Sequence, residues 1–133
     1  MKTAFCLINH QLTENQITEL REKYSVSNIK YPEPALSQVW AQIPATQQLD
    51  MKPINSVIEW LADAKAGDLV IIQGEYGSTF LLVDYAMKNH LVPLHAVSKR
   101  ISKEIRVGEQ VQKQNVFEHV CFRAYEYYSL QEV

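Results

Sequence analysis

Residues 74–79 are the part of the sequence best suited to hold a phosphate. They read Gly-Glu-Tyr-Gly-Ser-Thr, that is Gly74, Glu75, Tyr76, Gly77, Ser78 and Thr79. Glycine lets the backbone approach a ligand closely, and the unpaired N–H groups that open a helix attract anions. The spacing matches neither GxGxxG nor a Walker A loop, which needs a lysine before Ser78. Helix capping by Ser78 or Thr79 is the alternative, and both interpretations stay open.

A second candidate is the cationic segment 99–106, which follows Ser98. It holds Lys99, Arg100, Lys103 and Arg106, opposed only by Glu104. Arginine offers a planar fork for phosphate, and lysine offers a mobile point charge. We therefore expect Lys99 and Arg100 to contact phosphate, with a merely solvated loop as the alternative.

Asn9 and His10 form a third polar group at the end of an apolar run. Their side chains suit contacts with a base, a ribose hydroxyl or a phosphate. His10 can also transfer a proton near neutral pH. A structural role at a strand end is the alternative for His10.

Other kinds of active site find no support in the sequence. It contains no HxH, HExxH or CxxC motif, so neither a metal nor another cofactor is expected. Ser78 lacks the GxSxG context of a hydrolase nucleophile. Cys6 and Cys121 each lie among apolar residues, which predicts reduced core thiols.

Strand and helix patterns alternate along the chain and position these candidates. The expected strands cover residues 3–8, 27–31, 68–73 and 91–97, and the expected helices begin at Thr13, Pro34, Pro53 and Thr79. Thr13 and Gln16 fit a capping box at the first helix. Two later segments, 106–114 and 116–128, predict an antiparallel hairpin. The pattern indicates a Rossmann-like α/β fold: a mainly parallel sheet flanked by helices, with a C-terminal antiparallel β-hairpin.

Ligands of open α/β sheets bind beyond the carboxyl ends of the strands. The three candidate segments each follow an expected strand, so we expect them to meet at one edge of the sheet. The aromatic residues near the C-terminus are expected to serve sheet packing or a dimer surface, with base stacking as the alternative. They are Phe117, Phe122, Tyr125, Tyr127 and Tyr128.

Length and charge narrow the function classes further. The 133 residues, 15.3 kDa, fit one domain spanning 1–133. A net charge of −2 disfavours non-specific binding to duplex DNA, which depends on basic residues that contact the phosphates. No apolar run approaches the roughly 20 residues of a membrane span. The N-terminal segment lacks the features of a signal peptide, so the expected compartment is the cytoplasm and no membrane partner is expected.

Several segments together resemble a family of small CRISPR-associated proteins of type III systems, stand-alone relatives of the CRISPR-associated Rossmann fold. The resemblance is carried by Leu-Ile-Asn-His at 7–10 with Leu-Thr-Glu at 12–14, Trp-x-x-Ile-Pro at 40–44, Gly-Asp at 67–68, residues 73–79, and Ser-Lys-Arg at 98–100. It implies binding of cyclic oligoadenylate, with cyclic tetra-adenylate as the expected ligand. It further implies a ring nuclease that linearises this messenger as a homodimer, with the ring across the two-fold axis and no metal.

The resemblance also implies roles for the candidate residues. A ribose 2′-hydroxyl attacks the adjacent phosphorus and expels the 5′-oxygen. Lys99 and Arg100 stabilise the phosphoryl charge, with His10 assisting proton transfer. The ligand-binding positions are Asn9, Gly74, Glu75, Tyr76, Gly77, Ser78, Thr79 and Ser98.

Two other functions stay open at this point. One is a sponge or sensor that binds cyclic oligoadenylate without cutting it. The other is a protein-interaction module without a nucleotide, in which residues 74–79 only cap a helix. The sequence does not distinguish a four-membered from a six-membered ring.

Overall fold

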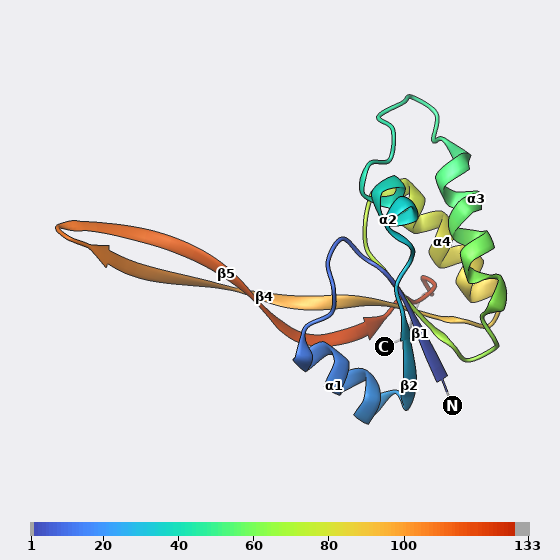
Figure 1. Cartoon of the computed structure of the whole chain (residues 1–133), viewed down its shortest axis with the longest axis horizontal. Helices are drawn as coiled ribbons and strands as arrows, with labels where there is room; N and C mark the ends of the chain where they lie inside the picture. Colours follow the sequence, from blue (N-terminus) through green and yellow to red (C-terminus); the bar gives the residue numbers. More distant parts are fainter. Residues whose placement is uncertain (1, 130–133) are drawn as a thin grey trace.

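A five-stranded sheet with the order β2-β1-β3-β4-β5 organises the chain in the computed structural model, which describes residues 2–129 (Figure 1). The strands are β1 (Lys2–Leu7), β2 (Val26–Lys30), β3 (Leu69–Ile72), β4 (Val92–Val107) and β5 (Gln110–Ala124). The helices are α1 (Glu14–Lys23), α2 (Pro34–Ala41), α3 (Met51–Trp60) and α4 (Tyr76–Lys88), with a 3₁₀ turn, η1 (Leu61–Asp63). The first four strands pair in parallel, and β5 pairs antiparallel with β4.

The predicted α/β fold with a C-terminal antiparallel hairpin is therefore confirmed. Residues 1 and 130–133 of the predicted domain lie outside the described part of the chain. Within residues 2–129, no helix has both the length and the apolar character needed to cross a membrane.

Helices cover both faces of the sheet, and each face has its own apolar core. Phe5 of β1 and Val70 of β3 face α2, α3 and α4, whereas Cys6 and Ile71 on the same strands face α1. This alternation follows from the two-residue period of a strand. Both cysteines are free thiols, and Cys6 lies in the core as predicted, whereas Cys121 is only partly buried. Burial raises the pKa of Cys6 to about 12.

Local sequence signals fix the helix starts. The Gln16 N–H donates to Thr13 Oγ1 at 3.3 Å, and the Thr13 N–H donates to Gln16 Oε1 at 3.0 Å, which confirms the capping box. Helix α3 begins at Met51 rather than at the predicted Pro53. The reason is Asp50, whose carboxylate accepts a hydrogen bond from the Lys52 N–H and caps the helix earlier.

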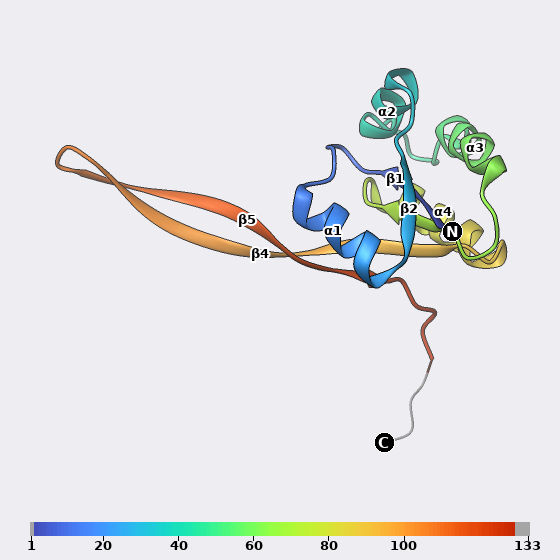
Figure 2. The same cartoon turned by 60° about the horizontal axis from the view of Figure 1, so that its bottom comes forward.

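The predicted end of the fourth strand is wrong. Strand β4 does not stop at residue 97 but continues to Val107, and β5 returns beside it as a long two-stranded ribbon (Figures 1 and 2). The turn lies at Gly108, whose φ of 64° suits glycine at the first position of a two-residue hairpin turn. Residues 106–114 therefore span this turn instead of forming one strand.

The ribbon contains one irregularity near its root. Val97 pairs with Cys121, but the next residue, Ser98, pairs with His119. Val120 is thus an extra residue in β5, as in a β-bulge. Two β5 side chains, His119 and Phe122, both reach helix α1, on either side of this extra residue.

Candidate functional site

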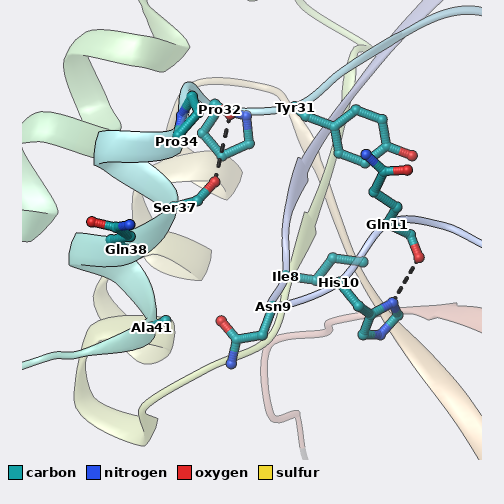
Figure 3. Close-up of a pocket in the computed structure, with 10 residues that line it drawn as sticks. All are labelled: Ile8, Asn9, His10, Gln11, Tyr31, Pro32, Pro34, Ser37, Gln38 and Ala41. Carbon is teal, nitrogen blue, oxygen red and sulfur yellow. Dashed lines mark hydrogen bonds between the residues drawn. The ribbon is translucent and has the colours of Figure 1, made fainter.

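Two hollows open at the carboxyl ends of the first three strands. The β1/β2 hollow has a volume of about 380 Å³ and lies between the loop after β1 and the start of α2. The β1/β3 hollow, about 200 Å³, lies where the chain crosses from one side of β1 to the other. Such a switch point is where open α/β sheets bind ligands. Asn9 and His10 line both hollows, and Gly74 lines the second. Figure 3 shows the side chains that line the β1/β2 hollow.

The hydrogen bond of His10 defines which ring nitrogen is free. His10 Nδ1 lies 2.8 Å from the carbonyl oxygen of Gln11 (Figure 3). A carbonyl oxygen only accepts, so Nδ1 carries the hydrogen and Nε2 of the neutral ring is an acceptor. The ring is exposed. Within residues 2–129 no hydrogen bond involves Nε2, so His10 offers a proton acceptor beside both hollows, which suits proton abstraction.

The β1/β2 hollow combines apolar walls with polar side chains that carry donors and acceptors. Tyr31, Pro32 and Pro34 supply the apolar surface, and Asn9 and Gln38 supply carboxamides. The Tyr31 hydroxyl accepts a hydrogen bond from the Leu12 N–H at 3.2 Å, which ties β2 to the loop that carries His10. Carboxamides match the donor and acceptor edge of adenine.

Gly74 is required by packing. A Cβ at this position would lie 2.7 Å from the Trp40 ring, which is buried in the core. Trp40 Nε1 also donates to the carbonyl oxygen of Gln73 at 3.0 Å. The Gln73 side chain, which sequence reasoning missed, accepts from the Ala96 N–H at 2.9 Å and joins the end of β3 to β4. Only the apolar character of residues 68–72 hinted that Gln73 ends a strand.

The sequence predicts that residues 76–79 form a loop before α4. In the structure they are instead the first turn of this helix. Glu75 is the N-cap, and its carboxylate accepts from the N–H groups of Gly77 and Ser78, each at 2.8 Å. These hydrogen bonds, from Gly77 first and then Ser78, lower the pKa of Glu75. The helix is therefore capped by Glu75, not by Ser78 or Thr79. A carboxylate already fills the place where a phosphate was expected.

Side chains of the same first turn have distinct surroundings. Ser78 is buried, and its hydroxyl donates to Glu75 Oε1 at 2.8 Å. The Thr79 hydroxyl oxygen is buried and has no hydrogen-bond partner within residues 2–129. Tyr76 is 92% exposed, so its ring is free for an intermolecular contact.

Ser98, Lys99 and Arg100 lie inside β4, so their predicted position beyond the carboxyl end of the fourth strand is wrong. Neither Lys99 nor Arg100 lines the two hollows. Lys99 pairs with Glu118 and Arg100 with Phe117, and neighbouring residues of a strand point to opposite faces. The two cations of one chain therefore cannot grip the same phosphate from one side. The structure brings Asn9, His10 and Gly74 together at one edge and leaves these cations on the ribbon.

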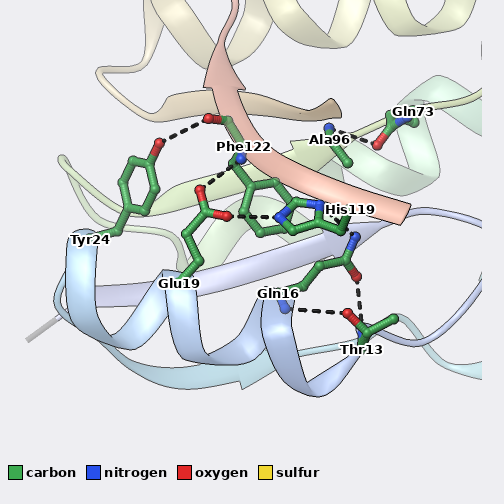
Figure 4. A network of polar contacts seen from close by, with 8 residues as sticks. All are labelled: Thr13, Gln16, Glu19, Tyr24, Gln73, Ala96, His119 and Phe122. Atoms are coloured by element: carbon green, nitrogen blue, oxygen red, sulfur yellow. Dashed lines mark hydrogen bonds and ion pairs between the residues drawn. The ribbon is translucent and has the colours of Figure 1, made fainter. Parts of the chain in front are cut away.

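A buried polar network joins α1 to the root of the ribbon (Figure 4). Glu19 Oε1 lies 2.7 Å from His119 Nε2, and Glu19 Oε2 accepts from the Phe122 N–H at 2.7 Å. Gln16 Nε2 lies 3.3 Å from His119 Nδ1. Because Gln16 Oε1 already accepts from Thr13, its amide nitrogen must donate, which makes Nδ1 an acceptor and puts the proton on Nε2.

This network was not visible in the sequence, because Glu19 and His119 are 100 residues apart. Its position on the α1 face separates it from the two hollows. Across residues 2–129, no group of three His, Cys, Asp or Glu side chains gathers closely enough to hold a metal ion.

Comparison with known proteins gives one family. Residues 2–123 match the family described as "Uncharacterized protein MJ1673 family". The "Uncharacterized protein MJ1673" of Methanocaldococcus jannaschii is 34% identical over 131 residues, which cover 96% of this chain and 100% of that protein. No solved structure matches the chain.

Proposed function

The chain belongs to the MJ1673 family, and we propose that it is a ring nuclease that binds cyclic tetra-adenylate and opens the ring. The observation that carries the proposal is His10, which lies between the β1/β2 and β1/β3 hollows with a free Nε2. In the cell, the reaction switches off the messenger of type III CRISPR systems in the cytoplasm.

The β1/β2 hollow takes an adenine base in this proposal. Its proline and tyrosine walls pack against the purine, and Asn9 and Gln38 hydrogen-bond to the base edge. The adjoining ribose and phosphate then reach the β1/β3 hollow, beside Gly74. His10 meets the ribose there because it lines both hollows.

Ring opening is an internal transesterification. The ribose 2′-oxygen forms a bond to the adjacent phosphorus, and the bond from phosphorus to the 5′-oxygen breaks. His10 Nε2 takes the proton of the 2′-hydroxyl, the leaving 5′-oxygen takes a proton from water, and His10 then returns its proton to the solvent. The product is a linear chain with a 2′,3′-cyclic phosphate at one end and a 5′-hydroxyl at the other. Holding the 2′-oxygen in line with the leaving group supplies most of the acceleration.

The cations Lys99 and Arg100 stabilise the phosphoryl charge. Because they point to opposite faces of the ribbon, they serve different phosphates of the ring. A homodimer with the ring across its two-fold axis supplies each cation twice. The four phosphates of cyclic tetra-adenylate match that number.

The proposal predicts cleavage of labelled cyclic tetra-adenylate in a single-turnover assay. Linear products ending in 2′,3′-cyclic phosphate are expected by chromatography, at the same rate with and without EDTA. Cyclic tetra-guanylate is the matched control for the adenine hollow and is expected to stay intact. Cleavage of cyclic hexa-adenylate in the same assay tests whether the protein prefers the four-membered or the six-membered ring.

Three other results contradict this function. A ring that binds but stays intact indicates a sponge or sensor instead. Loss of cleavage in EDTA replaces the internal attack with a metal-dependent mechanism. A protein whose melting temperature responds to no cyclic oligoadenylate indicates an interaction module without a nucleotide, since a bound ligand stabilises the folded state.

The variant Glu75→Gln tests whether the α4 N-terminus faces the bound ring. Glutamine keeps one oxygen, which accepts from the Ser78 or the Gly77 N–H but not from both as the two carboxylate oxygens do, and it removes the negative charge. We expect a several-fold lower Kd for cyclic tetra-adenylate, because the Glu75 carboxylate repels a nearby phosphate, and the gain should shrink as salt is added. Glu33→Gln, at the exposed N-cap of α2, is the matched control. An unchanged Kd places the ring away from α4.

A further inference from the structure

The outer part of the ribbon, residues 98–119, stands away from the rest of the molecule, and we call it the arm (Figures 1 and 2). The β3–β4 pairing ends at Leu94, and from Ser98 onward β4 pairs only with β5. Ten successive pairs, from Ser98–His119 to Val107–Gln110, give the arm a length of about 30 Å.

The arm is too apolar and too thin to be explained as a free hairpin. A single two-stranded hairpin is marginally stable in water at best. This one exposes large apolar side chains along most of its length. They are Ile105, Val107, Val111, Val116 and Phe117. Val111 and Phe117 lie on one face of the arm and the other three on the opposite face, so a partner against one face covers part of this apolar surface. Such exposure is typical of an interaction surface.

The register defines one face of the arm that combines cations with apolar groups. Directly opposed residues share a face, so Arg100 lies beside Phe117, and Arg106 lies beside Val111 on the same face. Lys113 also lies there, opposite Glu104. The partner of this face must therefore offer carboxylates and apolar or aromatic groups.

The body of the same molecule has a surface of that kind. A hollow of about 460 Å³ runs along the outer side of α4 and is lined by aromatic rings and two carboxylates, those of Glu126 and of Asp84, which also pairs with Lys88 at 2.8 Å. We call it the α4 groove. The side chains that matter are Tyr76, Phe80, Tyr127, Tyr128, Asp84 and Glu126. Phe80 is 72% exposed, although it lies on a regular helix. Arginine stacks on aromatic rings and pairs with carboxylates, so the arm face and the groove are complementary.

The charge of the two parts is complementary as well. The arm contains five basic and three acidic residues, a net charge of +2. Since the whole chain carries −2, the remainder carries −4. A basic arm and an acidic body on one chain favour contact between copies.

We propose that the arm of one copy lies in the α4 groove of a second copy and that the exchange is reciprocal. Each arm then lies in the groove of the other copy, and the two-fold axis that relates the copies limits the assembly to two. The network of Glu19 and His119 fixes the direction of the arm at its root. Arg106 and Lys113, toward the tip of the arm, make the ionic contacts with the groove, so the docking does not use Arg100, which the proposed function places on a ring phosphate.

The test is the mass of the full chain in solution, by light scattering after size exclusion. The wild-type protein is expected at twice 15.3 kDa. A variant in which Asn-Gly joins Ile101 to Val116, removing residues 102–115, is expected at the mass of one shortened chain, below the 15.3 kDa of the full chain, with the melting temperature of the body retained. Phe80→Glu is also expected to be monomeric. Met51→Glu, an exposed apolar position on α3, is the matched control and should stay dimeric.

Cross-linking distinguishes arm exchange from any other dimer. A mixture of Val111→Cys and Phe80→Cys chains is expected to form an intermolecular disulfide that neither variant forms alone. A monomeric wild-type protein overturns the proposal, as does a dimer that persists in both the shortened and the Phe80→Glu variants. A monomer whose arm binds RNA instead also overturns it, because nucleic acid is then the partner.

Discussion

Replacing His10 by alanine is expected to lower the single-turnover rate of ring opening by about 10²- to 10⁴-fold, the usual contribution of a general base. The Kd for the uncleaved ring should change little, because the ring binds through its bases and phosphates. His10 is exposed, so the variant should keep the wild-type melting temperature. The rate is measured with labelled cyclic tetra-adenylate at saturating protein.

His90→Asn is the matched control for this experiment. His90 is also exposed, and its φ of 61° is one that asparagine tolerates. Added imidazole should restore part of the activity of His10→Ala, since it can enter the open hollow and accept the same proton. Cleavage by His10→Ala at the wild-type rate excludes His10 as the base and leaves substrate positioning as the source of the acceleration.

The largest effect on stability is expected for Glu19→Ala. This change removes the carboxylate that accepts from both His119 and the Phe122 N–H. A hydrogen bond to a charged group contributes roughly 1.5–3 kcal/mol, so the loss in the free energy of unfolding should be about 3 kcal/mol. Urea denaturation followed by circular dichroism measures it.

Glu22→Ala is the control, because Glu22 lies on the same helix but is exposed and should shift the free energy of unfolding by less than about 0.5 kcal/mol. Glu19→Gln should fall between the two, since its amide oxygen can replace only one of the lost acceptors. Equal stability of Glu19→Ala and Glu22→Ala would show that the network does not hold the ribbon to α1.

Local signals predicted the body of the fold well. The capping box at Thr13 depends on residues three positions apart, and the burial of β3 depends on four successive apolar residues. Both are visible without knowledge of distant contacts. The alternation of strands and helices then predicted a mainly parallel sheet, whose strands end on one side, and this placed Asn9, His10 and Gly74 at one edge of the sheet.

The candidate site was harder to predict because its details depend on distant partners or on one competing side chain. Residues 98–106 are mostly polar, as in a loop, with Ile101 and Ile105 the exceptions, and only their pairing with β5 shows that they form a strand. The N–H groups of Gly77 and Ser78 can bind an anion, and the carboxylate of Glu75 already accepts their hydrogen bonds. Gly74 is required because its backbone packs against the ring of Trp40, which lies 34 positions away in the chain.

The extra residue Val120 sets a rule for how the length of this chain can vary among its relatives. Three positions separate His119 from Phe122, an odd number that ordinary strand alternation would turn to opposite faces. The extra residue in the bulge returns Phe122 to the face that His119 occupies, so both side chains contact α1. Loss of this one residue would reverse the faces of β5 beyond it. Toward the tip of the arm, an insertion or deletion keeps the cationic side chains on one face only when it changes each of the two strands by two residues, which is four residues in all.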